Sequence, residues 1–296
     1  MALESVETCP ICSSNQFQEF LTCKDYTTSG ETFDLQQCTQ CNLVITNPKP
    51  DENSIGSYYK SDSYISHSGS KKGIVNSLYL LARKFTLRSK TNLVQHHKSS
   101  GSILDYGCGT GEFLFTCKEA GLHISGVEPD ADARKKAQEL NGKTIVTNLA
   151  ELKERKFDII TAWHVLEHVA DLREKISELK LLLNKNGIIL IAVPNHKSFD
   201  AITYREHWAA YDVPRHLWHF SKENMESLLR EVDLQLIDIK PMKLDSFYVS
   251  LLSESYKNPN VNGLIKYFRG FITGLRSNQI AKKTMNYSSL IYIARL

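Results

Sequence analysis

The sequence lacks any long hydrophobic run. Its longest clear run, residues 188–193, has six residues, far fewer than the roughly 20 that a transmembrane helix needs. The first residues, MALESVET, have neither a basic start nor an apolar centre, so they do not resemble a secretory signal. We therefore expect a cytoplasmic protein without a transmembrane segment.

Extremes of composition are also missing. Hydrophobic residues make up 42% of the chain and charged residues 23%, which is ordinary for a soluble globular protein. The net charge of +3 selects no partner by itself. A length of 296 residues accommodates one α/β domain and a smaller unit. Seven cysteines without a secretory signal favour free thiols or a metal site over disulfides.

Four of the cysteines form two CxxC pairs near the N-terminus: Cys9 and Cys12, then Cys38 and Cys41. Four thiolates match the tetrahedral coordination of a structural Zn²⁺ and leave no open position. The residues between the pairs suit a short hairpin but include few apolar side chains, so metal binding would supply folding free energy. We interpret residues 1–47 as a zinc ribbon; a redox dithiol or chance spacing is the alternative.

Residues 48–98 follow as a helical linker or lid. Apolar residues recur at helical spacing, which predicts an amphipathic helix over residues 71–97. Residues 71–98 contain seven Lys or Arg and no acid. Two interpretations remain open: a solvated helix face, or an anion-binding face over a ligand site.

Residues 103–114, ILDYGCGTGEFL, indicate a strand, a turn and a helix that begins near Glu112. Three glycines stand at alternate positions of the turn: Gly107, Gly109 and Gly111. The dinucleotide motif G-x-G-x-x-G fails, because its third glycine falls on Glu112. Asp105 would repel a pyrophosphate but suits a cationic amine. Glu128, at the end of the next strand, can accept both hydroxyls of a ribose. These features indicate S-adenosylmethionine (SAM).

With these residues the chain resembles the class I SAM-dependent methyltransferases, over about residues 99–238 and the last strand. The resemblance implies an α/β fold: a Rossmann-like, mostly parallel seven-stranded sheet with an antiparallel last strand, covered by helices on both faces. It places this domain at residues 99–296, with an insertion at 245–286. The expected strands are residues 103–106, 123–127, 144–147, 157–161, 188–193, 234–240 and 289–294. Further cofactor contacts are expected at Tyr106, Cys108, Pro129, Asn148, Leu149, Ala162, Trp163 and His164.

Two histidine-rich segments follow strands at the edge where the ligand should bind. The first, TAWHVLEHV at residues 161–169, resembles the corresponding motif of quinone and small-molecule methyltransferases. His164 is a candidate base, and Glu167 and His168 follow it at three and four residues, on one face of the next helix turn. In some quinone O-methyltransferases the matching positions bind a divalent metal, with His164 here replacing a glutamate. The alternative is that Glu167 and His168 cap the helix and hold the loop.

The second segment is YDVPRHLWHFS, at residues 211–221. It resembles a segment of zinc-ribbon methyltransferases in which a histidine before an aromatic-Ser pair lies at the substrate. We expect His216 to be the general base, with Tyr211 and His219 behind it. Arg215 is expected to hold a carboxylate or phosphate of the substrate. In the alternative interpretation, His216 and His219 satisfy buried backbone groups.

The insertion at 245–286 contains an apolar stripe with basic neighbours. The stripe consists of Leu264, Phe268, Phe271 and Leu275. Its short length and two interrupting glycines favour a helix that packs on the core. The alternative is an interfacial helix on an anionic membrane.

Together these features predict a SAM-dependent methyltransferase acting on the oxygen or carbon of a small molecule. We expect a sugar or nucleotide-sugar first and a quinone precursor second, with an anionic group on the acceptor. The alternatives are an RNA methyltransferase that uses the ribbon and the basic helix, or a non-catalytic SAM-binding regulator. Nucleic acid is disfavoured because the ribbon is neither basic nor rich in aromatic residues.

Overall fold

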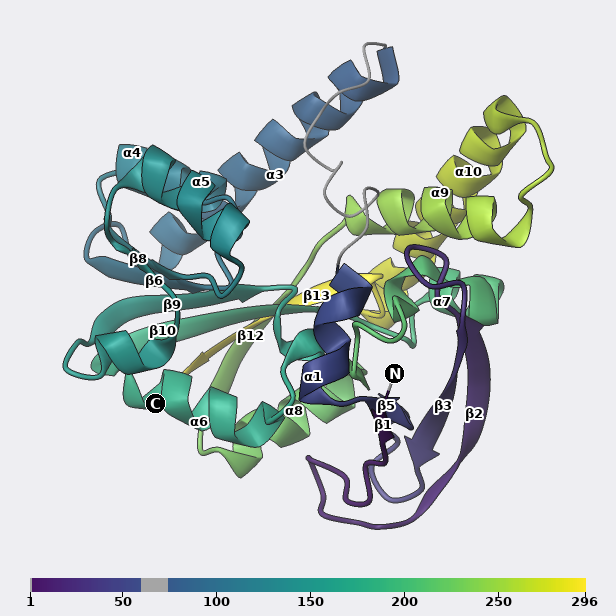
Figure 1. Ribbon diagram of the computed structural model, residues 1–296. Coiled ribbons are helices and arrows are strands. Elements are labelled where there is room, and N and C mark those ends of the chain that lie inside the picture. Colours follow the sequence, from purple (N-terminus) through teal and green to yellow (C-terminus); the bar gives the residue numbers. More distant parts are fainter. Residues whose placement is uncertain (1, 60–73) are drawn as a thin grey trace.

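The computed structural model describes residues 2–59 and 74–296, with residues 74–82 described by their backbone alone. A seven-stranded sheet lies at its centre, in the order β12-β13-β10-β9-β6-β7-β8 (Figure 1). The strands are β6 (Ser102–Tyr106), β7 (His123–Val127), β8 (Ile145–Val146), β9 (Phe157–Trp163), β10 (Leu183–Pro194), β12 (Gln235–Pro241) and β13 (Ser289–Arg295). β13 runs antiparallel to both neighbours, and the other pairings in this sheet are parallel. The predicted fold class is confirmed.

Helices cover both faces of the sheet (Figure 1). One face carries α3 (Ile74–His97), α4 (Glu112–Glu119) and α5 (Ala131–Asn141), which bury apolar side chains such as Leu114 against it. The other carries α6 (Leu172–Leu181) and α8 (Lys222–Glu231), whose buried residues include Ile176 and Leu228. The predicted helix at 71–97 corresponds to α3; its first three residues and its first apolar side chains lie outside the described part.

The N-terminal region forms a second, four-stranded sheet in the order β11-β4-β3-β2. Its strands are β2 (Phe17–Lys24), β3 (Thr32–Cys38), β4 (Val44–Thr46) and β11 (Trp218–His219), so the predicted hairpin is present but one strand comes from the far half of the chain. Ile11, Leu43 and Ile45 join the main hydrophobic core. This region, although it has few apolar side chains, therefore shares the hydrophobic core of the larger unit. A two-stranded sheet of β1 (Leu3–Glu4) and β5 (Lys49–Pro50), α1 (Glu52–Ile55) and η1 (Gly56–Tyr59) complete the region.

The insertion forms two helices, α9 (Asp245–Lys257) and α10 (Gly263–Thr284), which project beside α7 (Phe199–Tyr204) (Figure 1). The predicted packing of the apolar stripe of α10 is wrong. A Cβ on Gly270 would lie 2.9 Å from Leu251 Cα of α9, so the glycine face makes the close contact. Leu264 is 80% exposed and Phe268 is 67% exposed, while the ring of Phe271 lies 5.2 Å from that of Phe247 in α9.

Short 3₁₀ turns occupy the loops that follow the strands. They are η2 (Leu149–Leu152), η3 (Leu166–His168), η4 (Arg205–His207) and η5 (Ala209–Tyr211). In the described ranges, no helix has both the length and the apolar character needed to cross a bilayer.

Candidate functional site

The glycine turn connects β6 to α4 at the carboxyl edge of the parallel strands. All three of its glycines have positive φ, a conformation that side chains disfavour. A Cβ on Gly107 would lie 2.5 Å from Val165 Cγ2, and one on Gly111 would lie 3.0 Å from Ala137 Cα. The space beside the Cβ position of Gly109 is open, with nothing within 4 Å. The turn can therefore approach a ligand at Gly109 while its other glycines pack on the protein.

Two carboxylates flank this turn as predicted. Glu128, at the end of β7, accepts hydrogen bonds from the backbone N–H of Gly109 at 2.7 Å and of Asp130 at 2.9 Å. Asp105 is almost fully buried and accepts a 2.6 Å bond from Thr161 Oγ1. Burial raises the pKa of Asp105 to about 7, although that bond and the charge of Lys90 oppose the shift. A bound ammonium group would favour its ionised form.

Lys90 and Trp163 lie together beside the glycine turn. The sequence analysis predicted Trp163 as a cofactor contact but did not predict Lys90. Lys90 Nζ of α3 lies 4.4 Å from the centre of the Trp163 ring, which also packs against Phe113. Burial lowers the pKa of Lys90, while the carboxylates of Asp245 and Asp105 oppose the shift. Within the described residues, the buried Trp163 Nε1 has no hydrogen-bond partner. A cation beside Asp105 suits the carboxylate of an amino-acid ligand, and Trp163 was the predicted neighbour.

The remaining residues expected at the cofactor have varied surroundings. Asn148 is exposed and caps η2 by accepting a 3.0 Å bond from Ala150 N. Leu149 and Cys108 are each 8% exposed, whereas Ala162 is fully buried inside β9. Pro129 is exposed beside Glu128, and Tyr106 is half-buried. Ala162 has no exposed surface, so the structure leaves it no surface for the expected cofactor contact.

His164 stands between two carboxylates, immediately after β9. Its Nδ1 lies 3.3 Å from Glu167 Oε1, and its Nε2 lies 3.2 Å from Asp245 Oδ2, at the start of α9. Burial opposes the charged form, but these two carboxylates raise the pKa of His164 to about 9. An imidazole that is protonated at neutral pH is a poor general base, so this geometry favours a positioning role for His164. Asp245 was not foreseen, since it lies in the insertion.

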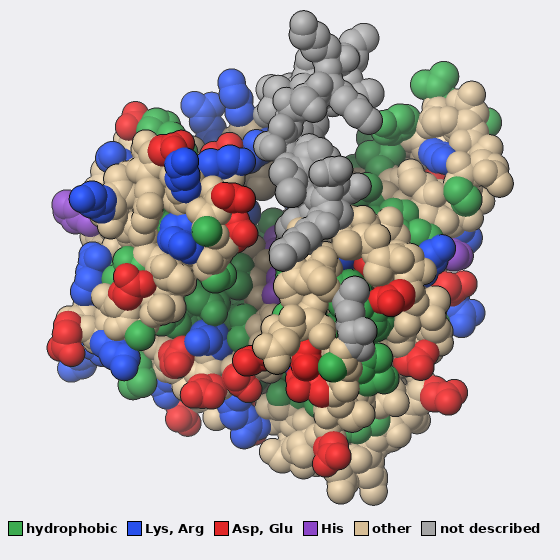
Figure 2. Space-filling view, viewed as in Figure 1, with side chains coloured by type: hydrophobic (Ala, Val, Ile, Leu, Met, Phe, Trp, Pro, Cys, Tyr) green, Lys and Arg blue, Asp and Glu red, His purple; other side chains and the backbone are tan. Residues whose placement is uncertain are grey.

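Glu167 is the centre of a buried cluster. Its side chain is 0% exposed, and its charged partner is His164, whose Nδ1 lies 3.3 Å from Oε1. One ligand atom from each of Glu167, His168 and His216 lies within 4.8 Å of the other two. Figure 2 shows the hollow on this side of the molecule, with a histidine visible inside it. The alternative interpretation, in which Glu167 caps the helix, is therefore wrong for this side chain.

This cluster matches a donor set that divalent metals accept. One carboxylate and two imidazoles are the protein ligands of several zinc and ferrous sites. The sequence interpretation placed His164 in the first ligand position, whereas the structure brings His216 to the cluster instead. His168 also holds the loop, because its Nδ1 lies 3.0 Å from the carbonyl oxygen of Arg215. Burial lowers the pKa of His168 to about 4, so this imidazole is neutral.

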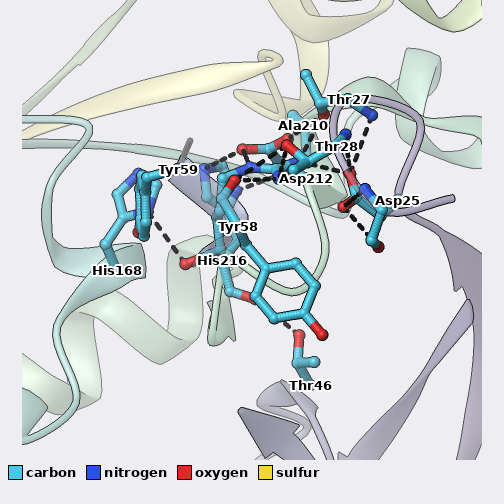
Figure 3. A network of polar contacts seen from close by, with 12 residues as sticks. Asp25, Thr27, Thr28, Thr46, Tyr58, Tyr59, His168, Ala210, Asp212 and His216 are labelled. Carbon is cyan, nitrogen blue, oxygen red and sulfur yellow. Dashed lines mark hydrogen bonds and ion pairs between the residues drawn. The ribbon is translucent and has the colours of Figure 1, made fainter. Parts of the chain in front are cut away.

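His216 is oriented by its backbone surroundings (Figure 3). Its Nδ1 lies 2.8 Å from the carbonyl oxygen of Ala210, which can only accept, so Nδ1 carries the proton and Nε2 has the free lone pair. Nε2 lies 4.0 Å from Asp212 Oδ2, and the ring meets that of His168 edge to face at 4.6 Å. A histidine in this tautomer, beside carboxylates, can accept a proton at Nε2.

Arg215 does not reach a substrate, contrary to the sequence prediction. Its side chain is 0% exposed and bonds Asp25 at 3.0 Å and Asp212 at 2.6 Å. It also donates to the carbonyl oxygen of Tyr58 at 3.0 Å. The guanidinium thus ties the loop of His216 to the N-terminal region, because its donors are satisfied by protein groups.

Replacing Arg215 by lysine is expected to lower the free energy of unfolding by about 2–3 kcal/mol. Lysine keeps the charge but lacks the planar fork that reaches both carboxylates. Chemical denaturation of both proteins measures the difference. Arg230→Lys, on the exposed side of α8, is the matched control and should change stability by less than about 0.5 kcal/mol. Equal stability of the two variants would contradict the assignment.

Tyr211 and His219 lie behind His216, where the sequence analysis expected them. Both are buried, and their rings meet at 5.2 Å. His219 Nε2 lies 3.1 Å from Thr46 Oγ1, and Thr46 Oγ1 also donates to the carbonyl oxygen of His216. Burial lowers the pKa of His219 well below its usual value. These contacts favour supporting roles for both residues.

The four N-terminal cysteines come together. Their sulfur atoms all lie within 4.8 Å of one another, and the Cys9–Cys41 and Cys12–Cys38 pairs are each separated by 3.5 Å. Tetrahedral bonds of about 2.3 Å to zinc require sulfur separations of about 3.8 Å. The residues present therefore fit a structural Zn²⁺.

Comparisons with known proteins agree with this geometry. A family model described as a methyltransferase domain matches residues 79–239. A ubiquinone biosynthesis O-methyltransferase of Actinobacillus pleuropneumoniae is 28% identical over 171 residues, which cover 52% of this chain and 72% of that protein. One of Pelagibacter ubique is 28% identical over 213 residues, with 64% and 82% covered. The structure of magnesium protoporphyrin IX methyltransferase from Synechocystis shares the fold, with a TM-score of 0.53, 15% identity, and 83% and 100% covered.

Proposed function

Since this chain belongs to the methyltransferase-domain family and is a SAM-dependent methyltransferase, we propose that it methylates a hydroxyl of a small aromatic molecule with His216 as general base. The acceptor oxygen attacks the methyl carbon of the sulfonium, the carbon–sulfur bond breaks, and S-adenosylhomocysteine leaves. The hydroxyl proton goes to Nε2 of His216. Holding the acceptor, methyl and sulfur in line supplies much of the rate enhancement.

The buried carboxylate of Glu167 is the observation that carries this proposal. A fully buried carboxylate is costly even beside the charged imidazole of His164, and such groups concentrate at functional sites. The charge of His216 lowers the pKa of Glu167, together with the larger effect of His164 and against the effect of burial. Glu167 is thus suited to stabilise the imidazolium that His216 becomes after accepting the proton.

The acceptor class rests on two further observations. The named relatives are O-methyltransferases of ubiquinone biosynthesis, and Arg215 cannot hold the phosphate of a nucleotide-sugar because it is buried. An assay of S-adenosylhomocysteine formed from SAM, with either catechols or nucleoside-diphosphate keto-sugars as acceptors, tests the choice. We expect turnover of catechols; turnover of the sugars alone would favour C-methylation and contradict the proposal.

Replacing Glu128 by glutamine is expected to weaken S-adenosylhomocysteine binding by about ten- to a hundredfold, because charged hydrogen bonds to the ribose hydroxyls become neutral. Isothermal titration calorimetry measures the change. The matched control is Glu139→Gln on the exposed side of α5, which should bind as the wild type does. Wild-type affinity in the Glu128 variant would exclude the ribose contact.

A further inference from the structure

The α9–α10 hairpin presents an apolar surface that the rest of the described chain does not cover. The exposed fractions along α10 are 80% for Leu264, 67% for Phe268, 53% for Phe271 and 38% for Leu275. These positions recur at three- and four-residue spacing, so they form one stripe on one side of the helix. Isolated exposed hydrophobic residues are common, but a continuous stripe on a projecting helix marks an interaction surface.

The orientation of this stripe follows from an adjacent side of α10, which consists of small residues. Gly270, Gly274, Ser277 and Ala281 are buried there, and their small size lets α9 approach closely. A Cβ on Gly274 would lie 2.9 Å from Phe247 Cα. Since the small residues make the packing contact, the large apolar side chains are left facing outward (Figure 2 shows hydrophobic atoms on this hairpin).

Positive charge borders the stripe. From residue 257 to the end the chain has seven Lys or Arg and no acid. A groove of about 440 Å³ beside the stripe is lined by Lys257, Arg269 and Arg276 together with Phe268. Its single carboxylate, Glu254, lies 3.6 Å from Arg269 and its side chain is only 6% exposed. The groove therefore retains positive charge next to an apolar surface.

We propose that the α9–α10 hairpin docks on an anionic phospholipid bilayer, with the stripe among the acyl chains and the basic groove at the headgroups. An amphipathic helix with apolar residues on one side and cations around it has this behaviour. Pairing with a second copy is disfavoured, because a twofold interface would bring the same cations together. The proposal is independent of the acceptor.

Co-sedimentation of the full chain with extruded vesicles tests the proposal. We expect binding to mixed phosphatidylcholine and phosphatidylglycerol vesicles and about tenfold weaker binding to phosphatidylcholine alone, since each surface cation contributes. Leu264→Ser with Phe268→Ser should weaken binding at least about tenfold. Leu181→Ser, at a 68% exposed leucine of α6, is the matched control and should bind normally.

Charge is tested separately with Arg276→Gln, which should weaken binding about fivefold, against Lys185→Gln at an exposed position of β10. Thermal melts verify that each variant folds. Equal binding to neutral and mixed vesicles would overturn the anionic assignment. Absence of vesicle binding, or a dimer in light scattering that the Leu264 and Phe268 substitutions dissociate, would overturn the bilayer as the occupant.

Discussion

Replacing His216 by glutamine is expected to lower kcat by about 10²–10⁴-fold, the usual contribution of a general base. The affinity for S-adenosylhomocysteine should stay unchanged, because His216 lies in the Glu167 cluster and we expect the cofactor to bind at the glycine turn and Glu128. Steady-state kinetics, with calorimetry for the cofactor, measure these quantities.

The control for this variant is His123→Gln, at an exposed position at the start of β7, which should leave kcat unchanged. Metal content of the wild type and the His216 variant is measured in parallel. A bound metal that the substitution removes would assign His216 as a ligand instead of a base. A kcat within about threefold of the wild type would exclude both roles for this residue.

Replacing Cys38 by alanine is expected to release the zinc ion and lower the melting temperature by about 10 °C or more, since structural zinc contributes directly to folding. Cys38 is fully buried at the end of β3. The same sheet contains β11, which begins two residues after His216. Activity should therefore fall with the metal.

Cys23→Ala provides the matched comparison, because Cys23 is also buried in this sheet but lies outside the sulfur cluster. It should retain one zinc per chain and lose about 1 kcal/mol of stability. Mass spectrometry of the metal and thermal unfolding measure both outcomes. Equal zinc content and equal stability of the Cys38 and Cys23 variants would contradict a structural metal site. So would a wild-type protein that binds no zinc when zinc is supplied.

Local patterns in the sequence predicted the sheet and the turn of glycines between β6 and α4. Asp105 lies in β6, the glycine turn follows β6, Glu128 follows β7, and these two neighbouring strands pair in parallel. Their spacing alone therefore predicted how they would meet. The clustering of the four cysteines could also be predicted, because two CxxC pairs have few functions other than metal binding.

Arg215 shows where this reasoning stops. Its carboxylate partner Asp25 lies 190 residues earlier in the chain, and no local pattern indicates their pairing. An arginine in a histidine-rich loop looked like a substrate ligand for that reason. Asp245 was missed in the same way, since it reaches His164 from an insertion that has no motif of its own.

The α10 stripe was misassigned for a different physical reason. Large apolar residues at helical spacing usually mark the buried side of a helix. Here the close contact with α9 uses Gly270 and Gly274, which were interpreted as interruptions of the stripe. When small residues make the packing contact, the large apolar residues of the helix remain exposed. The spacing of the apolar residues does not reveal which set packs against the neighbouring helix.

A crystal structure of the protein with bound S-adenosylhomocysteine tests the central claim most directly. The account predicts the ribose hydroxyls on Glu128, the amino group near Asp105, and the sulfur facing an open path to His216 and Glu167. A sulfur directed away from this cluster, or a cluster sealed from the cofactor, would contradict it.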